Sequence, residues 1–149
     1  VLMAVGAKSL TSNDSWYLYR YWVVNFNRHL LCCKNSVSSS IIRGKVWNNA
    51  TLSALSTVTF GQYYHVVVTY NHPGSISSLY VNGELQSTAA GTYSSSGASN
   101  FINIGQAGNQ ATGTFFNGSV PVFKVYRNTA LTANEVLQNF EATRGRYGI

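Results

Sequence analysis

The sequence predicts an all-β protein: an antiparallel two-sheet jelly-roll sandwich with one short C-terminal helix near residues 132–141. Three observations favour this fold. Only 9% of the 149 residues are charged, against roughly 25% in an average soluble domain, while 45% are hydrophobic and Ser, Thr, Asn and Gly are abundant. Many short β-branched or aromatic segments alternate with Asn- and Gly-rich turns, and helix signals gather only after Leu131. The length suits a single domain over residues 1–149.

The strand signals differ in strength along the chain. The clearest is YYHVVVTY at 63–70, which is dense in β-branched and aromatic residues. Asn82 and Gly83 are the strongest hairpin signal, Pro121 favours a sheet edge or bulge, and a polar stretch at 34–39 separates two strands. The expected strands cover residues 1–5, 16–25, 29–33, 40–47, 63–70, 77–81, 84–87, 101–104 and 120–126.

The helix is expected to begin with a capping box. Thr132 is the predicted N-cap, and Glu135 three residues later can return a hydrogen bond to the N-cap backbone. Val136, Leu137 and Phe140 follow at helical spacing, so one face of this helix should be apolar.

Basic residues are concentrated in the first third of the chain. The formal net charge is +6, and residues 1–50 hold six Lys or Arg against Asp14 alone, whereas residues 51–123 hold none. These charges form either a solvated surface or a contact with an acidic partner, such as an anionic glycan or a neighbouring subunit. No dense basic run or nucleic-acid motif is present, and no apolar run is long enough for membrane insertion, so neither partner is expected. The candidate partner contacts are Arg20, Arg28, Arg43 and Lys45.

The two cysteines, Cys32 and Cys33, are neighbours in the sequence. A disulfide between adjacent residues is strained, because its usual Cα separation exceeds one peptide step. No zinc-binding spacing is present either. We expect free thiols, at least one of them buried in a strand.

Four segments in a fixed order carry a family resemblance: YYHVVVTYN, SLYVNGEL, FINIGQ and FFNGSVPVFKVYRNTALTANEVLQNFEA. This order resembles the laminin-G-like, concanavalin A-like jelly-roll family, in which an aromatic-His-Val strand leads into a Leu-Tyr-Val-Asn-Gly hairpin. The resemblance covers residues 60–142 well and residues 1–59 loosely. The tail at 140–149 resembles domains of this family found in phage and other viral structural proteins.

The resemblance also implies several strands before the one that VLMAVG matches. Either another chain or a segment outside this sequence covers the sheet edges that their absence would expose, or residues 1–59 are themselves the first strands. The family often has an acidic pair where this sequence has Pro121 and Val122. With four acidic residues in all, a calcium site is hard to build, and no metal or other cofactor is expected.

Catalysis is not expected. The glycoside hydrolases that share this fold use two carboxylates across the sugar bond. Here Asp14 lies in a loop, Glu84 in a hairpin, and Glu135 and Glu141 in the helix, with no Glu-x-Asp-x-Glu arrangement. His65 lies inside the clearest strand and is interpreted as a packed histidine. Serine-nucleophile and phosphate-loop motifs are missing.

Aromatic and amide side chains are therefore the candidate ligand-binding groups. Strand alternation predicts three tyrosines on one face, about 7 Å apart, where they would stack on sugar rings, line an interface or pack inside the sandwich. A Trp-Asn-Asn run ends a strand at a loop, the rim where related lectin-like domains hold ligands; core packing is the alternative. These candidates are Tyr17, Tyr19, Tyr21, Trp47, Asn48 and Asn49.

Two functions follow as expectations. The first is a non-enzymatic surface module of a virus or phage particle, either a capsid decoration or a fibre component. On the virion surface it would contact other structural chains in symmetric multiple copies and bind glycans or the host surface. The alternative is a secreted or cell-surface, lectin-like carbohydrate-binding domain with an extracellular location.

Overall fold

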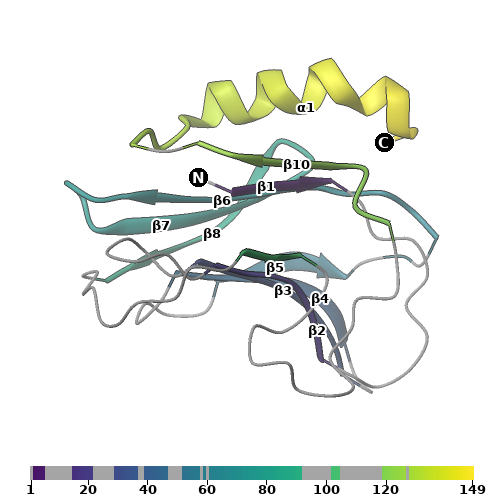
Figure 1. Cartoon of the computed structure of the whole chain (residues 1–149), viewed down its shortest axis with the longest axis horizontal. Helices are drawn as coiled ribbons and strands as arrows, with labels where there is room; N and C mark the ends of the chain where they lie inside the picture. Colours follow the sequence, from purple (N-terminus) through teal and green to yellow (C-terminus); the bar gives the residue numbers. More distant parts are fainter. Residues whose placement is uncertain are drawn as a thin grey trace.

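The computed structural model describes residues 2–5, 15–21, 29–36, 39–46, 52–57, 59, 61–91, 102–104, 119–126 and 128–149. Ten strands and one helix in these residues form three layers (Figure 1). The elements are β1 (Leu2–Val5), β2 (Ser15–Tyr21), β3 (His29–Ser36), β4 (Ser39–Val46), β5 (Leu52–Thr57), β6 (His65–Asn71), β7 (Ile76–Val81), β8 (Glu84–Ala90), β9 (Ile102–Ile104), β10 (Val122–Val125) and α1 (Ala133–Tyr147).

Two five-stranded antiparallel sheets face each other. The order β10-β1-β6-β7-β8 forms the helix-covered sheet, named for α1, which lies along its outer side (Figure 1). The order β5-β4-β3-β2-β9 forms the second sheet, called the basic sheet for the Lys and Arg positions described below. The predicted antiparallel β architecture with a C-terminal helix is confirmed. Pro121 precedes β10, which is an edge strand as predicted.

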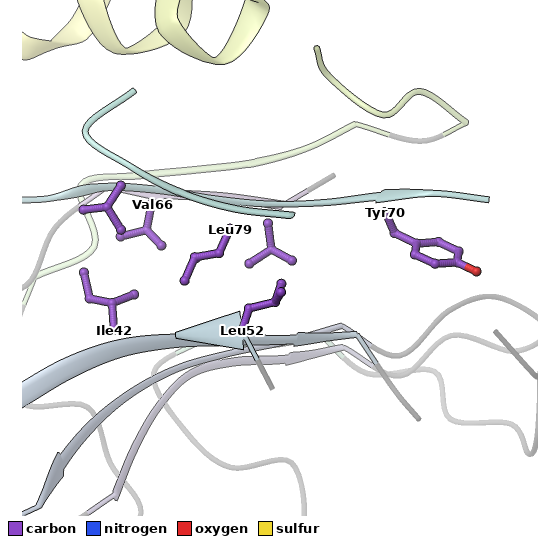
Figure 2. Close-up of a cluster of buried hydrophobic side chains, with 7 residues drawn as sticks. Ile42, Leu52, Val66, Tyr70 and Leu79 are labelled. Carbon is purple, nitrogen blue, oxygen red and sulfur yellow. The ribbon is translucent and has the colours of Figure 1, made fainter. Parts of the chain in front are cut away.

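The main core lies between the two sheets (Figure 2). Ile42 and Leu52 of the basic sheet, each 1% exposed, pack against Val66, Val68 and Leu79 of the helix-covered sheet. Burying side chains of this size contributes about 1.5–3 kcal/mol each, so this contact is the main force that holds the sheets together.

The helix-covered sheet is buried on its other face as well. Val67 of β6 and Tyr80 of β7 point away from the main core and pack with Leu131 and Val136 at the helix. Residues 65–70 are therefore all buried, without the in-out alternation of a sheet that has one face in water. The helix-covered sheet therefore lies between two apolar layers, the main core on one face and the contact with α1 on the other.

The hairpin between β7 and β8 serves as the contact point for α1. Asn82 and Gly83 have φ angles of 50° and 82°, the geometry of a tight hairpin turn. The His65 backbone N–H donates to Asn82 Oδ1 at 2.9 Å, and the Asn82 N–H donates to the His65 carbonyl at 2.8 Å. A Cβ at position 83 would lie 3.0 Å from atoms of Leu137 and Phe140, so glycine allows the helix to approach this closely.

Helix α1 begins as predicted and ends later. The Thr132 side chain accepts from the Glu135 N–H, and Glu135 accepts from the Thr132 N–H at 2.7 Å, which completes the capping box. The helix continues to Tyr147 rather than ending near residue 141, because the left-handed residue that stops it is Gly148 (φ 68°).

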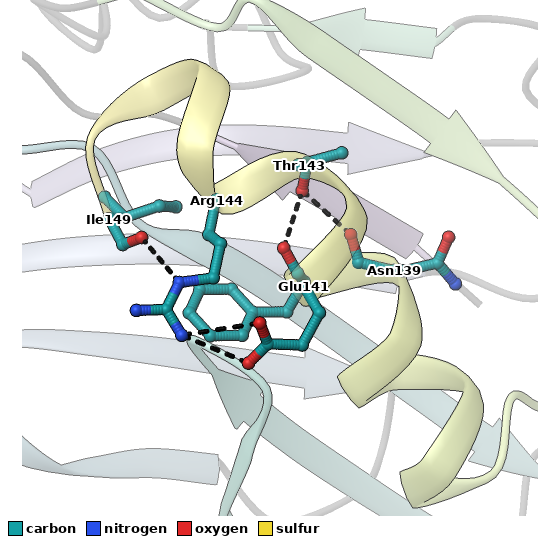
Figure 3. A network of polar contacts seen from close by, with 6 residues as sticks. Asn139, Glu141, Thr143, Arg144 and Ile149 are labelled. Atoms are coloured by element: carbon teal, nitrogen blue, oxygen red, sulfur yellow. Dashed lines mark hydrogen bonds and ion pairs between the residues drawn. The ribbon is translucent and has the colours of Figure 1, made fainter.

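Polar contacts near the end of α1 support this extra length (Figure 3). Arg144 donates to Glu141 at 3.1 Å and to the Ile149 carbonyl at 3.2 Å, and the Thr143 hydroxyl donates to the Asn139 carbonyl at 2.8 Å. Tyr147 and Ile149 pack against the buried cluster between the helix-covered sheet and α1, so the C-terminal Arg-Gly-Arg-Tyr-Gly-Ile sequence is part of the fold.

Each of the nine predicted strands has a counterpart, but β5 was not predicted. Its leucines, Leu52 and Leu55, are three positions apart, so one is buried while the other is 83% exposed, and the segment shows no apolar face. The polar stretch at 34–39 was also predicted to be a longer break. Strands β3 and β4 pair through Ser36 and Ser39, because the ladder supplies backbone hydrogen bonds whatever the side chains are.

Candidate functional site

The five strands of the basic sheet hold four cations and no acidic residue. Arg20 lies in β2, Lys34 in β3, and Arg43 and Lys45 in β4. The acidic residues within the described part of the chain lie elsewhere: Glu84 in β8, and Glu135 and Glu141 in α1. The excess of basic residues in the first third of the sequence therefore lies in one sheet, whereas the strands of the helix-covered sheet hold one cation, Lys124, and one carboxylate, Glu84.

Strand register places these cations relative to the core. Ile42 and Gly44 are buried toward the helix-covered sheet, so alternation places Arg43 and Lys45 on the opposite, outer face. Residues directly opposite each other in antiparallel strands share a face. Two outer rows result, Ser53–Arg43–Cys32–Tyr17 and Lys45–Leu30–Arg20–Asn103.

Arg43 lies in the first of these rows, in β4, beside the edge strand β5. Its side chain is partly buried, and its Nε atom is buried without a hydrogen-bond partner among the described residues. More than nine in ten buried polar groups in proteins are hydrogen-bonded, and an unpaired buried donor costs about 1–3 kcal/mol. The Arg43 Nε is therefore a buried donor to which the described residues offer no acceptor.

The structure brings some predicted site residues together and separates others. Arg43, Lys45 and Arg20 occupy neighbouring rows of one face. Lys34, directly opposite Ile41 in β3, was not predicted, because a polar run from residue 34 resembled a loop. The remaining candidates, Arg28, Trp47, Asn48 and Asn49, lie outside the described residues.

The three tyrosines do not form one row. Tyr17 is opposite Cys32, but Tyr19 is opposite Leu31, so β2 contains one extra residue at this point. Such a bulge reverses the alternation beyond it. Tyr17 thus shares the outer row of Arg43, whereas Tyr19 lies in the row of Gly44, on the core side. The prediction that all three share a face is wrong for this physical reason.

The cysteine pair also lies on this sheet. Cys32 and Cys33 are consecutive positions of β3, opposite Arg43 and Ile42 respectively. Cys33 thus belongs to a core-facing row and Cys32 to the outer row. Both lie in a strand, which agrees with the strand position predicted for at least one of them.

His65 has a packing role, which confirms its prediction. It is fully buried, and its ring centroid lies 5.7 Å from that of Phe140. Burial, assisted by the charge of Lys124, lowers the pKa of His65 to about 4, so the imidazole is neutral at physiological pH.

The described carboxylates serve the helix. Glu135 caps it, and the Thr132 backbone hydrogen bond lowers the pKa of this carboxyl, the direction opposite to that needed by a general acid. Glu141 pairs with Arg144. In the part of the chain that the structure describes, no three His, Cys, Asp or Glu residues gather in a way that could hold a metal ion. None of its helices has the length and hydropathy needed to span a membrane.

Three solved structures show a similar fold at low sequence identity. A native heptameric SAP-like pentraxin from Limulus polyphemus is 19% identical with a TM-score of 0.63, over 91% of this chain and 67% of that one. A Bacteroides ovatus protein assigned as carbohydrate-binding is 18% identical with a TM-score of 0.67, over 92% of this chain but only 39% of that one. The CBM40 of a Ruminococcus gnavus IT-sialidase, solved with α2,3-sialyllactose, is 18% identical with a TM-score of 0.65, over 93% and 81%.

Comparison with curated proteins gives no match. The family model of the concanavalin A-like lectin/glucanases superfamily, in its laminin G form, matches residues 11–137, which is most of the chain. This match agrees with the two antiparallel sheets and the family resemblance seen in the sequence. The chain belongs to the concanavalin A-like lectin/glucanase superfamily.

Proposed function

We propose that this chain is a non-enzymatic glycan-binding module whose ligand lies on the outer face of the basic sheet. The observation that carries the proposal is Arg43 of β4, whose Nε is buried and has no acceptor among the described residues. An unpaired buried donor costs about 1–3 kcal/mol, so an acceptor that a ligand supplies at Arg43 would be stabilising.

The composition of this face suits a sugar. Tyr17 and Arg43 occupy one row and are separated by a single strand, which puts their backbones about 10 Å apart. An aromatic ring can stack on the apolar face of a sugar, while a guanidinium binds its oxygen atoms. Ser53 and Asn103 add polar positions to the same face. The family and the carbohydrate-binding names of two similar structures support this reading.

A location outside the cell or on its surface fits this function, since that is where glycans are displayed. Single glycan-binding sites are weak, and several linked copies raise the overall affinity by 10²–10⁴, as an order of magnitude. The similar pentraxin is heptameric. We propose that this module also acts in multiple copies.

A virus or phage particle is the second candidate setting, as a capsid decoration or fibre component. It is favoured by the tail at residues 140–149, which resembles viral structural domains, and by a surface of low charge. Native mass spectrometry of material from its source separates the settings: a particle module is found in many symmetric copies with other structural chains, a free lectin as a monomer or small oligomer.

Binding can be tested with an array of neutral and acidic oligosaccharides, followed by calorimetry on each ligand found. We expect Arg43→Gln to weaken binding at least tenfold. Arg146→Gln makes the same chemical change on the exposed side of α1 and should leave binding unchanged. Binding to no glycan would overturn the proposal, and so would a ligand whose affinity survives both Arg43→Gln and Tyr17→Ala.

A further inference from the structure

We infer that the ligand is an acidic glycan, and that Arg43 binds its carboxylate or sulfate group. This inference rests on the proposed function and narrows it to one class of sugar. Three features of the basic sheet carry it: the local charge, the geometry of a guanidinium, and the contrast with arginines elsewhere in the chain.

Among the described residues of the basic sheet, the local charge is uncompensated. The strands of the basic sheet contribute four cations and no carboxylate. From the strand spacing, the backbones of Lys34, Lys45 and Arg20 lie within about 12 Å of Arg43. This distance is comparable with the Debye length of about 8–10 Å, so the charges act together on a group held at Arg43. A neutral sugar would leave this positive potential unopposed.

The geometry of Arg43 fits a two-oxygen anion. A guanidinium binds carboxylate or sulfate side-on through two parallel N–H bonds, and Nε is one of the two donors of that edge. In Arg43 this Nε is the atom that is buried and unpaired among the described residues. A hydroxyl accepts one such bond, whereas a carboxylate accepts both and also neutralises the charge.

The arginines of α1, in contrast, have partners within the chain. Arg144 has a carboxylate partner in Glu141 and a carbonyl partner in Ile149, so the fold itself satisfies its donors. Arg146 lies over the Tyr147 ring at 5.7 Å in an exposed position. Arg43 differs in being partly buried, in lying in a sheet whose strands carry three further cations, and in having no such acceptor for its Nε among the described residues. The missing acceptor is the anion of the ligand.

Matched glycan pairs test the inference directly. Calorimetry would compare α2,3-sialyllactose with lactose for the carboxylate, 3′-sulfolactose with lactose for the sulfate, and trigalacturonic acid with its methyl ester for a uronic acid. We expect the acidic member of at least one pair to bind at least tenfold more tightly, and the preference to fall several-fold as NaCl rises from 50 to 300 mM. The pair that shows the preference identifies the source of the anion.

Variants separate a specific contact from general attraction. Arg43→Gln should abolish the preference, and Arg43→Lys should abolish most of it, because lysine keeps the charge but lacks the side-on fork. Arg146→Gln is the matched control and should leave the preference intact. Thermal unfolding of each variant checks that it is folded. If Arg43→Gln is not folded, Lys45→Gln should still reduce the preference several-fold.

Each other outcome has a defined meaning. Equal binding of acidic and neutral partners would overturn the inference and leave the proposed function standing, whereas binding to none of many glycans would overturn both. Equal affinity for a short DNA duplex, insensitive to Arg43→Lys, would show non-specific attraction and overturn the inference.

Discussion

The two sheets of this sandwich differ in burial and in charge. The helix-covered sheet is buried on both faces, against the basic sheet on one side and α1 on the other, and its strands β6 and β7 contain no charge. The basic sheet shares the main core but carries cations on its outer rows. The helix-covered sheet is therefore a structural layer, and the outer face of the basic sheet is where we propose that a ligand binds. Substitutions should separate these roles, with a loss of stability in one sheet and a loss of affinity in the other.

The largest loss of stability is expected in the shared core. Leu79 is fully buried between the sheets, so Leu79→Ala should lower the free energy of unfolding by about 2–5 kcal/mol, the usual cost of such a cavity. Ile76 lies in the same strand and is 44% exposed, so Ile76→Ala should cost less than about 1 kcal/mol. Urea unfolding measures both values. Similar losses would show that the main core is not where the structure places it.

The next effect is a dependence of stability on pH, caused by His65, which packs against Phe140 of α1. The pKa of His65 is lowered in the folded protein to about 4, from an ordinary value of 6.5, so below pH 6.5 the unfolded chain binds more protons. Stability contributed by neutral His65 is present above pH 6.5 and is lost as pH falls toward 4, by an amount on the order of 3 kcal/mol.

Urea unfolding between pH 4 and 7 checks this dependence. The fall should disappear in His65→Gln, and it should persist in His72→Gln, where the residue is an exposed turn residue. If the pH dependence persists in His65→Gln, a titrating group other than His65 causes it.

A smaller effect is expected at the contact between the hairpin and the helix. Gly83→Ala introduces two penalties, a positive φ of 82° and a Cβ that would approach Leu137 and Phe140 to 3.0 Å. Gly61→Ala introduces only the first, because φ is also 82° but nothing lies within 4 Å. We expect a loss of about 1 kcal/mol for Gly61→Ala and about 2–3 kcal/mol for Gly83→Ala. Equal losses would mean that α1 does not press on the turn.

The smallest effect on stability is expected at Arg43. Arg43→Met keeps most of the aliphatic volume and removes a buried, unpaired donor, so stability should change by less than about 1 kcal/mol or rise. Glycan binding should nevertheless be lost. A loss of stability above 2 kcal/mol would instead give Arg43 a structural role like that of the helix-covered sheet.

Local sequence signals predicted much of the helix-covered sheet. The segment at 63–70, the Asn82 and Gly83 turn and the Thr132 capping box each depend on nearby residues, and each lies where it was expected. The end of α1 was predicted too early, because the apolar stripe fades after Phe140 while Gly148 provides the stop.

The basic sheet depended more on tertiary context. The bulge between Tyr17 and Tyr19 leaves the alternating sequence pattern unchanged, yet it moves half of the strand to the other face. Arg43 was among the predicted contacts, but nothing in the sequence distinguishes it from Arg20. Its distinction is the buried Nε, which arises only when the sheet is assembled.

The neighbouring thiols of β3, Cys32 and Cys33, offer two labelling sites within the basic sheet. Position 32 belongs to the row of Arg43, and position 33 to the row of Ile42 in the core. A thiol reagent should therefore react with the two cysteines at rates that are controlled by different processes. If a ligand binds the outer face as proposed, we expect the reaction with Cys32 to slow in its presence, and the reaction with Cys33 to depend on how often the sandwich opens. Mass spectrometry of one labelled peptide would record ligand residence and domain breathing together.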